Sequence, residues 1–341
     1  MSLQPEGQDQ TKPSPRRGLG LSSLAFGGAP VGNLYANVDE TGALAAIAHA
    51  WHGGIRHFDT APYYGYGLSE TRIGAALQGV ERSTYTLSTK VGRLIDVDAG
   101  RRDRSDGFAV DGQRVHFDYS RDGVLRSLET SIRRLRTDRI DILLLHDIGA
   151  LTHGARHADV LAQALDEALP AMAELRDQGV VGAIGIGVNE EAICLEIMQR
   201  FPLDAIMLAG RYTLFEQDHS RAVMARAEAD DVAVLIAGPY NSGLLGSENG
   251  PGDTYDYVPA TPEVKARAQR FYDVCRHTGT QVGAAALQFP AAHPAVASVV
   301  CGLRSIAEVD SALDRMRAAV PAATWKALKD EGLLTPEVPT P

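Results

Sequence analysis

The feature that most constrains the fold is an alternation of short apolar runs with longer helical patterns, repeated eight times along the chain. Nearly every short run is rich in β-branched residues or leucine, as expected of strands buried on both faces. Strands are expected at residues 22–26, 55–58, 84–89, 140–145, 183–186, 205–208, 232–236 and 297–301. Helices are expected at residues 40–51, 69–78, 120–135, 218–229, 262–277 and 305–316, with one more ending near Gln178 and one running through Met198. This order is typical of parallel strands joined by helical crossovers.

Eight such units predict an α/β protein folded as a closed (β/α)8 TIM barrel. The main alternative is an open doubly wound sheet, which would carry GxGxxG directly after its first strand. Three Gly-x-Gly segments fail this test. The one at 18–20 has no strand before it, the one at 65–67 lacks the third glycine, and the one at 185–187 lies in the middle of an expected strand. We therefore expect one barrel domain over residues 18–341, preceded by a polar, proline-rich and disordered tail at residues 1–17.

Charge and cysteine content narrow the possible partners. The net charge of −10 argues against binding to nucleic acid or to anionic membranes. No run approaches 18 apolar residues, and the first 17 residues lack the apolar core of a signal peptide. Cys194, Cys275 and Cys301 are far apart and form neither a disulfide framework nor a zinc motif. We expect a cytoplasmic protein without a metal, and nothing in the sequence indicates its oligomeric state.

Two long segments interrupt the regular spacing, at residues 96–119 and 147–159. Each follows the carboxyl end of a strand, so in a barrel both overhang the catalytic face. Long loops at that face are typically lids or substrate walls. The alternative for the first is a disordered insertion, because residues 100–112 are highly polar.

Polar side chains stand directly after four of the expected strands. They are Asp59, Lys90, His146 and Asn189, and Tyr64 lies five residues beyond Asp59. Singly, each has a structural explanation such as a turn cap, a solvated charge or a hydrogen-bonded core histidine. Together they are expected at one rim of the barrel, because consecutive strands end there.

Proton transfer explains why these residue types belong together. A phenol with a pKa near 10 is a weak acid or base at neutral pH, and an ammonium group beside it favours the phenolate. Lys90 would supply that ammonium, Asp59 would keep it charged, and His146 would orient the substrate oxygen or share a proton with Tyr64. Such a site would exchange a proton while a cofactor exchanges a hydride.

These residues and their surroundings resemble the aldo-keto reductase family over residues 18 to about 317. The matching motifs are FDTAPYYG (58–65), LSTK (87–90), DILLLH (141–146), GAIGIGVN (182–189) and CGLRSIAE (301–308). The resemblance implies a catalytic tetrad of Asp59, Tyr64, Lys90 and His146. It selects Tyr64 over Tyr63, because the family's tyrosine lies five residues after the aspartate and directly before a glycine.

The resemblance also implies a nicotinamide dinucleotide extended across the barrel mouth. In it, Asn189 holds the carboxamide, Tyr212 stacks on the nicotinamide ring, and Gly28 permits close approach of the backbone. The residues implied to cover the pyrophosphate are Pro239, Ser242 and Leu244, and those implied at the adenosine end are Gly302, Arg304, Ser305 and Glu308.

Departures from the family pattern bear on the choice of cofactor. Val188 and Ala209 stand where the family commonly has serine and glutamine beside the carboxamide. Glu308 stands where many NADP-dependent members have arginine. Because a carboxylate repels a 2′-phosphate but accepts hydrogen bonds from a ribose hydroxyl, we expect NAD, with NADP possible through Arg304.

Within the family, the segments at 26–35, 59–70 and 152–154 resemble the branch of D-threo-aldose (L-fucose) 1-dehydrogenases and pyridoxal 4-dehydrogenases. That resemblance implies a small-molecule substrate, an aldose such as L-fucose or a pyridoxal-like hemiacetal, whose C1 hydroxyl is oxidised to a lactone. General aldehyde or ketone reduction is an alternative.

Two other classes compete with this interpretation. One is a nicotinamide-binding regulatory subunit, because such members retain the barrel and the tetrad. The other is a metal-dependent barrel hydrolase, since His57 and Asp59 form an HxD pair. The further strand-end ligands that such a hydrolase requires are not evident, and Lys90 fits the tetrad better.

Overall fold

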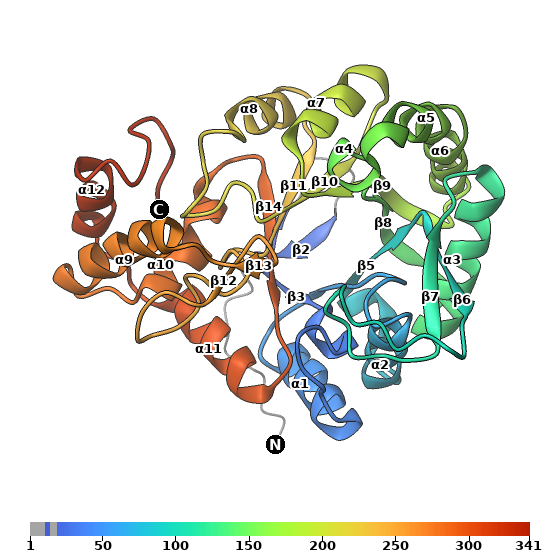
Figure 1. Cartoon of the computed structure of the whole chain (residues 1–341), viewed down its shortest axis with the longest axis horizontal. Helices are drawn as coiled ribbons and strands as arrows, with labels where there is room; N and C mark the ends of the chain where they lie inside the picture. Colours follow the sequence, from blue (N-terminus) through green and yellow to red (C-terminus); the bar gives the residue numbers. More distant parts are fainter. Residues whose placement is uncertain (1–10, 14–18) are drawn as a thin grey trace.

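The computed structural model describes residues 11–13 and 19–341. Eight parallel strands close into a barrel in the order β10-β11-β14-β3-β4-β5-β8-β9, with helices packed around it (Figure 1). This confirms the predicted (β/α)8 barrel. Its strands are β3 (Leu24–Gly27), β4 (His57–Asp59), β5 (Thr86–Val91), β8 (Ile140–His146), β9 (Val181–Val188), β10 (Ala205–Ala209), β11 (Ala233–Ala237) and β14 (Val296–Gly302).

Four of the helices that follow these strands begin at polar caps that the sequence supplies. The side chains of Asp39, Ser120, Thr261 and Ser305 each accept a hydrogen bond from a backbone amide of the first turn. The principal helices are α1 (Glu40–His52), α2 (Leu68–Ala76), α3 (Arg121–Leu135), α6 (Leu169–Asp177), α7 (Glu191–Arg200), α8 (Arg221–Ala229), α9 (Pro262–His277), α10 (Val282–Gln288), α11 (Ile306–Arg317) and α12 (Ala322–Asp330). Within the described residues, no helix is long and apolar enough to cross a membrane.

Alternation along the strands builds two apolar layers. In β8, Ile142 and Leu144 belong to a small cluster that also holds alanines from β3, β9, β10, β11 and β14. Leu143 and Leu145 belong to the larger cluster shared with the surrounding helices. Because successive side chains of a strand point to opposite faces, the first pair fills the barrel and the second packs against the helices. The barrel interior is therefore a packed core, and the site lies at its mouth.

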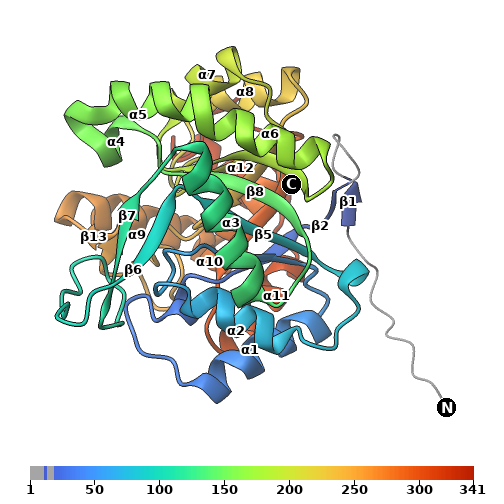
Figure 2. The ribbon, with the colours of Figure 1, turned by 90° about the vertical axis from the view of Figure 1, so that its right-hand side faces the viewer.

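Short antiparallel hairpins lie outside the barrel. At one end, β1 (Thr11–Pro13) pairs with β2 (Gly20–Ser22). At the opposite end lie β6 (Arg93–Val97), β7 (Gln113–Phe117) and the pair β12 (Thr254–Tyr255) and β13 (Val258–Pro259) (Figure 2). Apart from β1, the tail expected at residues 1–17 lies outside the described residues.

Both long segments are folded. The first forms the β6–β7 hairpin, whose loop contacts the N-terminal part of the barrel: Gly107 accepts a hydrogen bond from the Tyr35 amide at 2.8 Å, and Leu34 and Phe108 form a β-bridge. The second forms α4 (Ala150–His153), a 3-10 turn (Gly154–Arg156) and α5 (His157–Gln163). The alternative of a disordered insertion does not describe residues 96–119, which form one wall of the barrel mouth.

Candidate active site

A cavity of about 1050 Å³ opens at the carboxyl ends of the barrel strands. Ligand pockets in proteins usually span roughly 300–1,000 Å³, so this one has room for a large ligand. Of the predicted site residues, the cavity is lined by Gly28, Asp59, Tyr64, Lys90, His146, Asn189, Pro239, Ser242, Gly302, Arg304 and Glu308. The structure thus brings all four tetrad residues together, from β4, β5, β8 and the segment after β4.

The Lys90 ammonium is the most tightly held charge in the cavity. Its Nζ donates to both carboxylate oxygens of Asp59, at 3.1 and 2.8 Å, and to the Thr60 carbonyl at 2.9 Å. Lys90 and Asp59 are each 2% exposed. Burial alone would lower the pKa of Lys90, but the neighbouring carboxylate outweighs burial and raises it. Lys90 is therefore a permanently charged group at neutral pH.

Tyr64 lies over this ammonium and is half-buried. The Lys90 Nζ is 4.6 Å from the centroid of the Tyr64 ring. Gly65 follows with φ +63°, and a Cβ at Gly65 would collide with the Gly32 carbonyl oxygen, which explains the glycine after the tyrosine. Burial raises the pKa of Tyr64 to about 12, although Lys90 acts to lower it. The expected influence of Lys90 is present, but burial outweighs it, so Tyr64 is a neutral phenol at pH 7.

His146 faces the Tyr64 ring edge to face, with 6.1 Å between the ring centroids. Burial and the nearby cations Arg93 and Lys90 hold the pKa of His146 well below its usual value, so the imidazole is neutral. Its Nδ1 is buried and has no hydrogen-bond partner among the described residues. Its Nε2 lies 3.4 Å from the carboxylate of Asp147, which is paired with Arg93. A neutral imidazole here can donate or accept a hydrogen bond at a substrate oxygen.

Three predicted cofactor residues do not line the cavity. Tyr212 is 1% exposed and stacks on Phe289, with 5.6 Å between ring centroids. This placement does not fit stacking of Tyr212 on a nicotinamide ring. Leu244 is fully buried in the apolar layer shared with the helices. Ser305 is the N-cap of α11, where its Oγ accepts from the Glu308 amide at 3.2 Å.

The adenosine end that the sequence implies is partly neutralised by its own residues. The Glu308 carboxylate accepts from the Arg304 amide at 2.8 Å and from Arg304 Nε at 3.0 Å. Both side chains remain more than one-third exposed. Glu308 thus completes the helix cap and balances the charge of Arg304.

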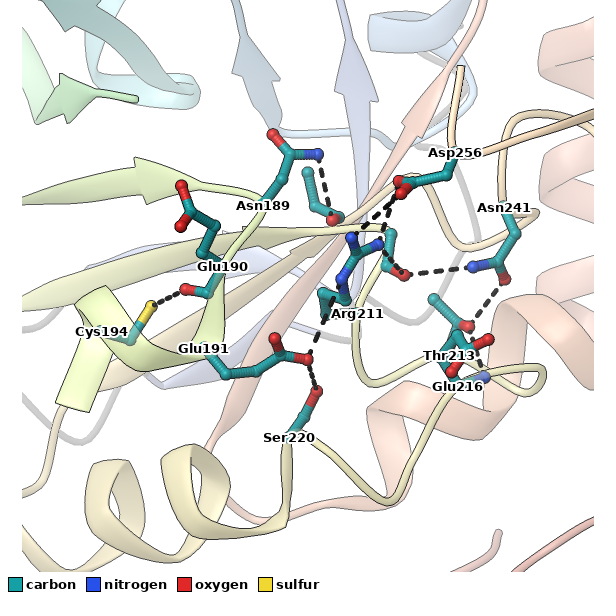
Figure 3. Close-up of polar contacts among 12 residues, drawn as sticks. Asn189, Glu190, Glu191, Cys194, Arg211, Thr213, Glu216, Ser220, Asn241 and Asp256 are labelled. Atoms are coloured by element: carbon teal, nitrogen blue, oxygen red, sulfur yellow. Dashed lines mark hydrogen bonds and ion pairs between the residues drawn. The ribbon is translucent and has the colours of Figure 1, made fainter. Parts of the chain in front are cut away.

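The hairpin β12–β13 contributes residues that the sequence did not suggest. Its two-residue turn, Asp256 and Tyr257, has φ of +48° and +67° and lines the cavity. The Tyr257 hydroxyl accepts from Asn189 Nδ2 at 3.3 Å. Asp256 forms a two-pronged ion pair with Arg211, at 3.1 and 3.2 Å (Figure 3). This ion pair holds the hairpin against the barrel mouth. The two residues are 45 positions apart, so only the folded structure shows that they meet.

His57 does not face the cavity. Its Nε2 lies 2.9 Å from Ser88 Oγ, its Nδ1 lies 3.4 Å from Ser298 Oγ, and its side chain is fully buried. Burial lowers the pKa of His57 to about 3. In residues 11–13 and 19–341, no group of three or more His, Cys, Asp or Glu is placed to hold a metal ion. Of the HxD pair at 57–59, His57 is therefore part of the core beneath the tetrad, and only Asp59 lines the cavity.

Comparison with known proteins adds independent findings. The model of the aldo/keto reductase family matches residues 23–330. The chain is 38% identical over 333 residues to pyridoxal 4-dehydrogenase from Microbacterium luteolum, covering 94% of this chain and 96% of that one. It is 37% identical over 330 residues to D-threo-aldose 1-dehydrogenase from Pseudomonas sp, covering 95% and 97%. It is 30% identical over 297 residues to L-galactose dehydrogenase from Arabidopsis thaliana, covering 86% and 83%.

Solved structures agree on the architecture. The holo form of the aldo-keto reductase AKR11C1 from Bacillus halodurans superposes with a TM-score of 0.71 at 25% identity, covering 94% of this chain and 95% of that one. The glycerol dehydrogenase AKR11B4 from Gluconobacter oxydans gives a TM-score of 0.71 at 23% identity, covering 94% of each chain. The second likeness bears on the fold alone.

Proposed function

The chain belongs to the aldo/keto reductase family and is an NAD(P)-dependent oxidoreductase, and we propose that it oxidises the cyclic hemiacetal hydroxyl of a small neutral aldose to a lactone, with NAD. The observation that carries the proposal is the arrangement at the cavity floor, where Lys90 is held by Asp59 at 2.8 Å and lies 4.6 Å from the Tyr64 ring centroid. With His146, this brings one phenol, one fixed cation and one neutral imidazole into the same cavity.

In the proposed reaction, Tyr64 is the group that moves the proton. Its phenolate form, favoured by the Lys90 ammonium, accepts the proton of the substrate hydroxyl. Asp59 keeps Lys90 charged and fixed, and His146 donates a hydrogen bond that orients the same substrate oxygen. The nicotinamide cofactor, when bound, supplies the hydride acceptor. In the reverse direction, neutral Tyr64 donates its proton to a carbonyl oxygen.

The residues around the cavity fit a dinucleotide. Gly28 lines the cavity, and an added Cβ there would lie 2.6 Å from Ser69 Oγ and 2.8 Å from the Asp59 carbonyl oxygen, so packing within the chain requires a glycine at this position. The Nδ2 of Asn189 makes only long hydrogen bonds of 3.3 Å, to the Ala209 carbonyl and to Tyr257, and is free to exchange them for a ligand amide. We assign the carboxamide to Asn189. The remaining part of the dinucleotide is assigned to Pro239, Ser242, Gly302, Arg304 and Glu308.

Pairing of charges near the tetrad supports a neutral substrate. Among the described residues there, each cation has a carboxylate partner: Lys90 with Asp59, Arg93 with Asp147, Arg101 with Asp106 and Arg104 with Asp111. A substrate phosphate or carboxylate would find no unpaired cation to receive it. The rings of Tyr35, Tyr63, Phe108 and Tyr257 line the same region and can pack against the apolar face of a sugar.

Pyridoxal is the second candidate substrate. It also forms a cyclic hemiacetal, it is neutral, and its flat ring suits the aromatic lining. The similarity to pyridoxal 4-dehydrogenase and to D-threo-aldose 1-dehydrogenase, at 38% and 37% identity, supports both candidates almost equally. The hemiacetal is the reacting group in either case.

A substrate panel under saturating NAD tests the proposal. We expect NADH to form with at least one of L-fucose, D-arabinose, L-galactose and pyridoxal, and pyridoxal 5′-phosphate to be a poor substrate. Parallel assays with NADP test the expected preference for NAD, which rests on the Glu308 carboxylate near the adenosine end. A clear advantage of NADP would refute that preference, and no turnover of any hemiacetal would refute the proposed reaction.

A further inference from the structure

Arg315 on α11 lines the same cavity but belongs to none of the predicted cofactor positions. Glu308, Ser311, Ala312 and Arg315 follow one another at helical spacing of three, one and three residues, so they share one face of α11. All four line the cavity. Arg315 therefore extends the implied adenosine end by one helical turn, toward the segment 238–248 on the opposite wall.

The Arg315 guanidinium is buried and poorly satisfied. Its side chain is 11% exposed, and its Nε has no hydrogen-bond partner among the described residues. One terminal nitrogen lies 3.4 Å from the Tyr240 hydroxyl, and the other lies 3.9 Å from a Glu248 carboxylate oxygen. Glu248 is 67% exposed, so water screens that pair. A buried guanidinium with such weak partners is unfavourable unless a ligand completes its hydrogen bonds.

A glycine on α10 leaves room for this guanidinium. Gly283 lies against it, and a Cβ at Gly283 would be 2.7 Å from the Arg315 Cζ. Arg304 lines the same cavity and is paired with the Glu308 carboxylate at 3.0 Å, whereas Arg315 has no carboxylate within hydrogen-bond distance. Of the two cations at this end of the cavity, Arg315 is the one with unused donors.

We propose that Arg315 binds a phosphate group of the adenine dinucleotide. This inference rests on the proposed function, because it assumes that the cavity holds NAD or NADP. A guanidinium offers donors in a planar fork that matches two phosphate oxygens. The ligand phosphate replaces the weak contact with Tyr240 and the screened pair with Glu248. The same chemistry is offered by the pyrophosphate of both dinucleotides and by the 2′-phosphate of NADP.

Calorimetric titration of the ligand-free protein tests this assignment without relying on turnover. We expect Arg315→Met to weaken ADP or 2′-AMP binding about tenfold or more, since a hydrogen bond to a charged group is lost. Arg315→Lys keeps the charge but not the planar fork of donors, so its nucleotide affinity should lie between those of the unmodified protein and Arg315→Met. Arg317→Met is the matched control, because Arg317 lies on the same helix but donates to the Gly53 carbonyl outside the cavity.

The ligands distinguish the phosphates and the possible failures. A loss for ADP, NADH and NADPH but not for 2′-AMP assigns Arg315 to the pyrophosphate. A loss for 2′-AMP and NADPH but not for ADP or NADH assigns it to the 2′-phosphate; either result supports the inference. Unchanged affinity for both nucleotides, or an equal loss for adenosine, would overturn it. If the unmodified protein bound neither NADH nor NADPH, the proposed function would fail instead.

Discussion

The Lys90 ammonium lies 4.6 Å from the centroid of the Tyr64 ring while donating to both oxygens of Asp59. Each of the three groups has its own role in the proposed reaction. Asp59 compensates the buried charge of Lys90, and the Lys90 ammonium in turn favours the phenolate form of Tyr64. The pair is almost fully enclosed, so each partner depends on the other for its stability as well as for its role.

Removing one partner of this pair should destabilise the fold. Lys90→Met leaves the Asp59 carboxylate buried with only Ser88 as a side-chain donor, at 2.8 Å. We expect a loss of about 3–5 kcal/mol in the free energy of unfolding, measured by urea denaturation. The double variant Asp59→Asn with Lys90→Met should recover most of that stability and remain inactive. Equal stability of the single variant and the unmodified protein would contradict the structural role.

The rate of oxidation should rise with pH. Tyr64 accepts a proton in that direction and must be ionised, while its pKa in the ligand-free protein is about 12. The ionised fraction, and with it log(kcat/KM), is expected to climb with a slope near one from pH 7 into the alkaline range. Reduction uses the neutral phenol and should stay flat there. A fall in oxidation rate between pH 7 and 9 would contradict the assignment.

Acid should destabilise the protein through His57. The pKa of His57 is about 3 in the folded chain against about 6.5 when unfolded. The stability that depends on a neutral His57 is therefore fully present above pH 6.5 and declines as the pH falls toward 3. By pH 5 the contribution should have fallen by about 2 kcal/mol. In His57→Gln the drop in unfolding free energy between pH 7 and pH 5 should be smaller by that amount. Identical drops in the two proteins would refute the prediction.

The ion pair between Arg211 and Asp256 should slow cofactor release. Asp256 lies in the hairpin turn that lines the cavity, and Arg211 anchors it from the segment after β10. For a partly exposed pair worth about 1 kcal/mol, Asp256→Asn should speed NADH dissociation about fivefold. Asp253→Asn is the control, since Asp253 pairs with Lys265 on the surface. Stopped-flow displacement measures both rates, and equal rates would show that the pair has no such role.

The sequence predicted the barrel because its signal is local. The strands are short buried runs, the segments between them have helical patterns, and four helices begin at a capping side chain, so the eight units could be recognised without knowledge of their neighbours. The tetrad followed from the rule that strand ends meet at one rim. The sequence did not predict the hairpins β6–β7 and β12–β13, because their strands are only two to five residues long and lie outside the β/α alternation.

Side-chain direction in irregular segments was the other limit. Tyr212 lies just after β10 with φ +53°, and this local turn directs its ring toward Phe289. Its direction follows from tertiary packing and not from its spacing to other residues. Arg315, in contrast, had a readable signal: it shares a helix face with Glu308, which was already a candidate. What the sequence did not show was that its donors would be left without strong partners.

The measurement that tests the central claim most directly is NADH formation by Tyr64→Phe and Tyr63→Phe with the best hemiacetal substrate. The account predicts that Tyr64→Phe lowers kcat about 10²- to 10⁴-fold with NADH affinity unchanged, because only a proton carrier is lost. Tyr63→Phe should stay within about tenfold of the unmodified enzyme, a change that leaves proton transfer intact. Turnover by Tyr64→Phe equal to that of Tyr63→Phe would contradict the account.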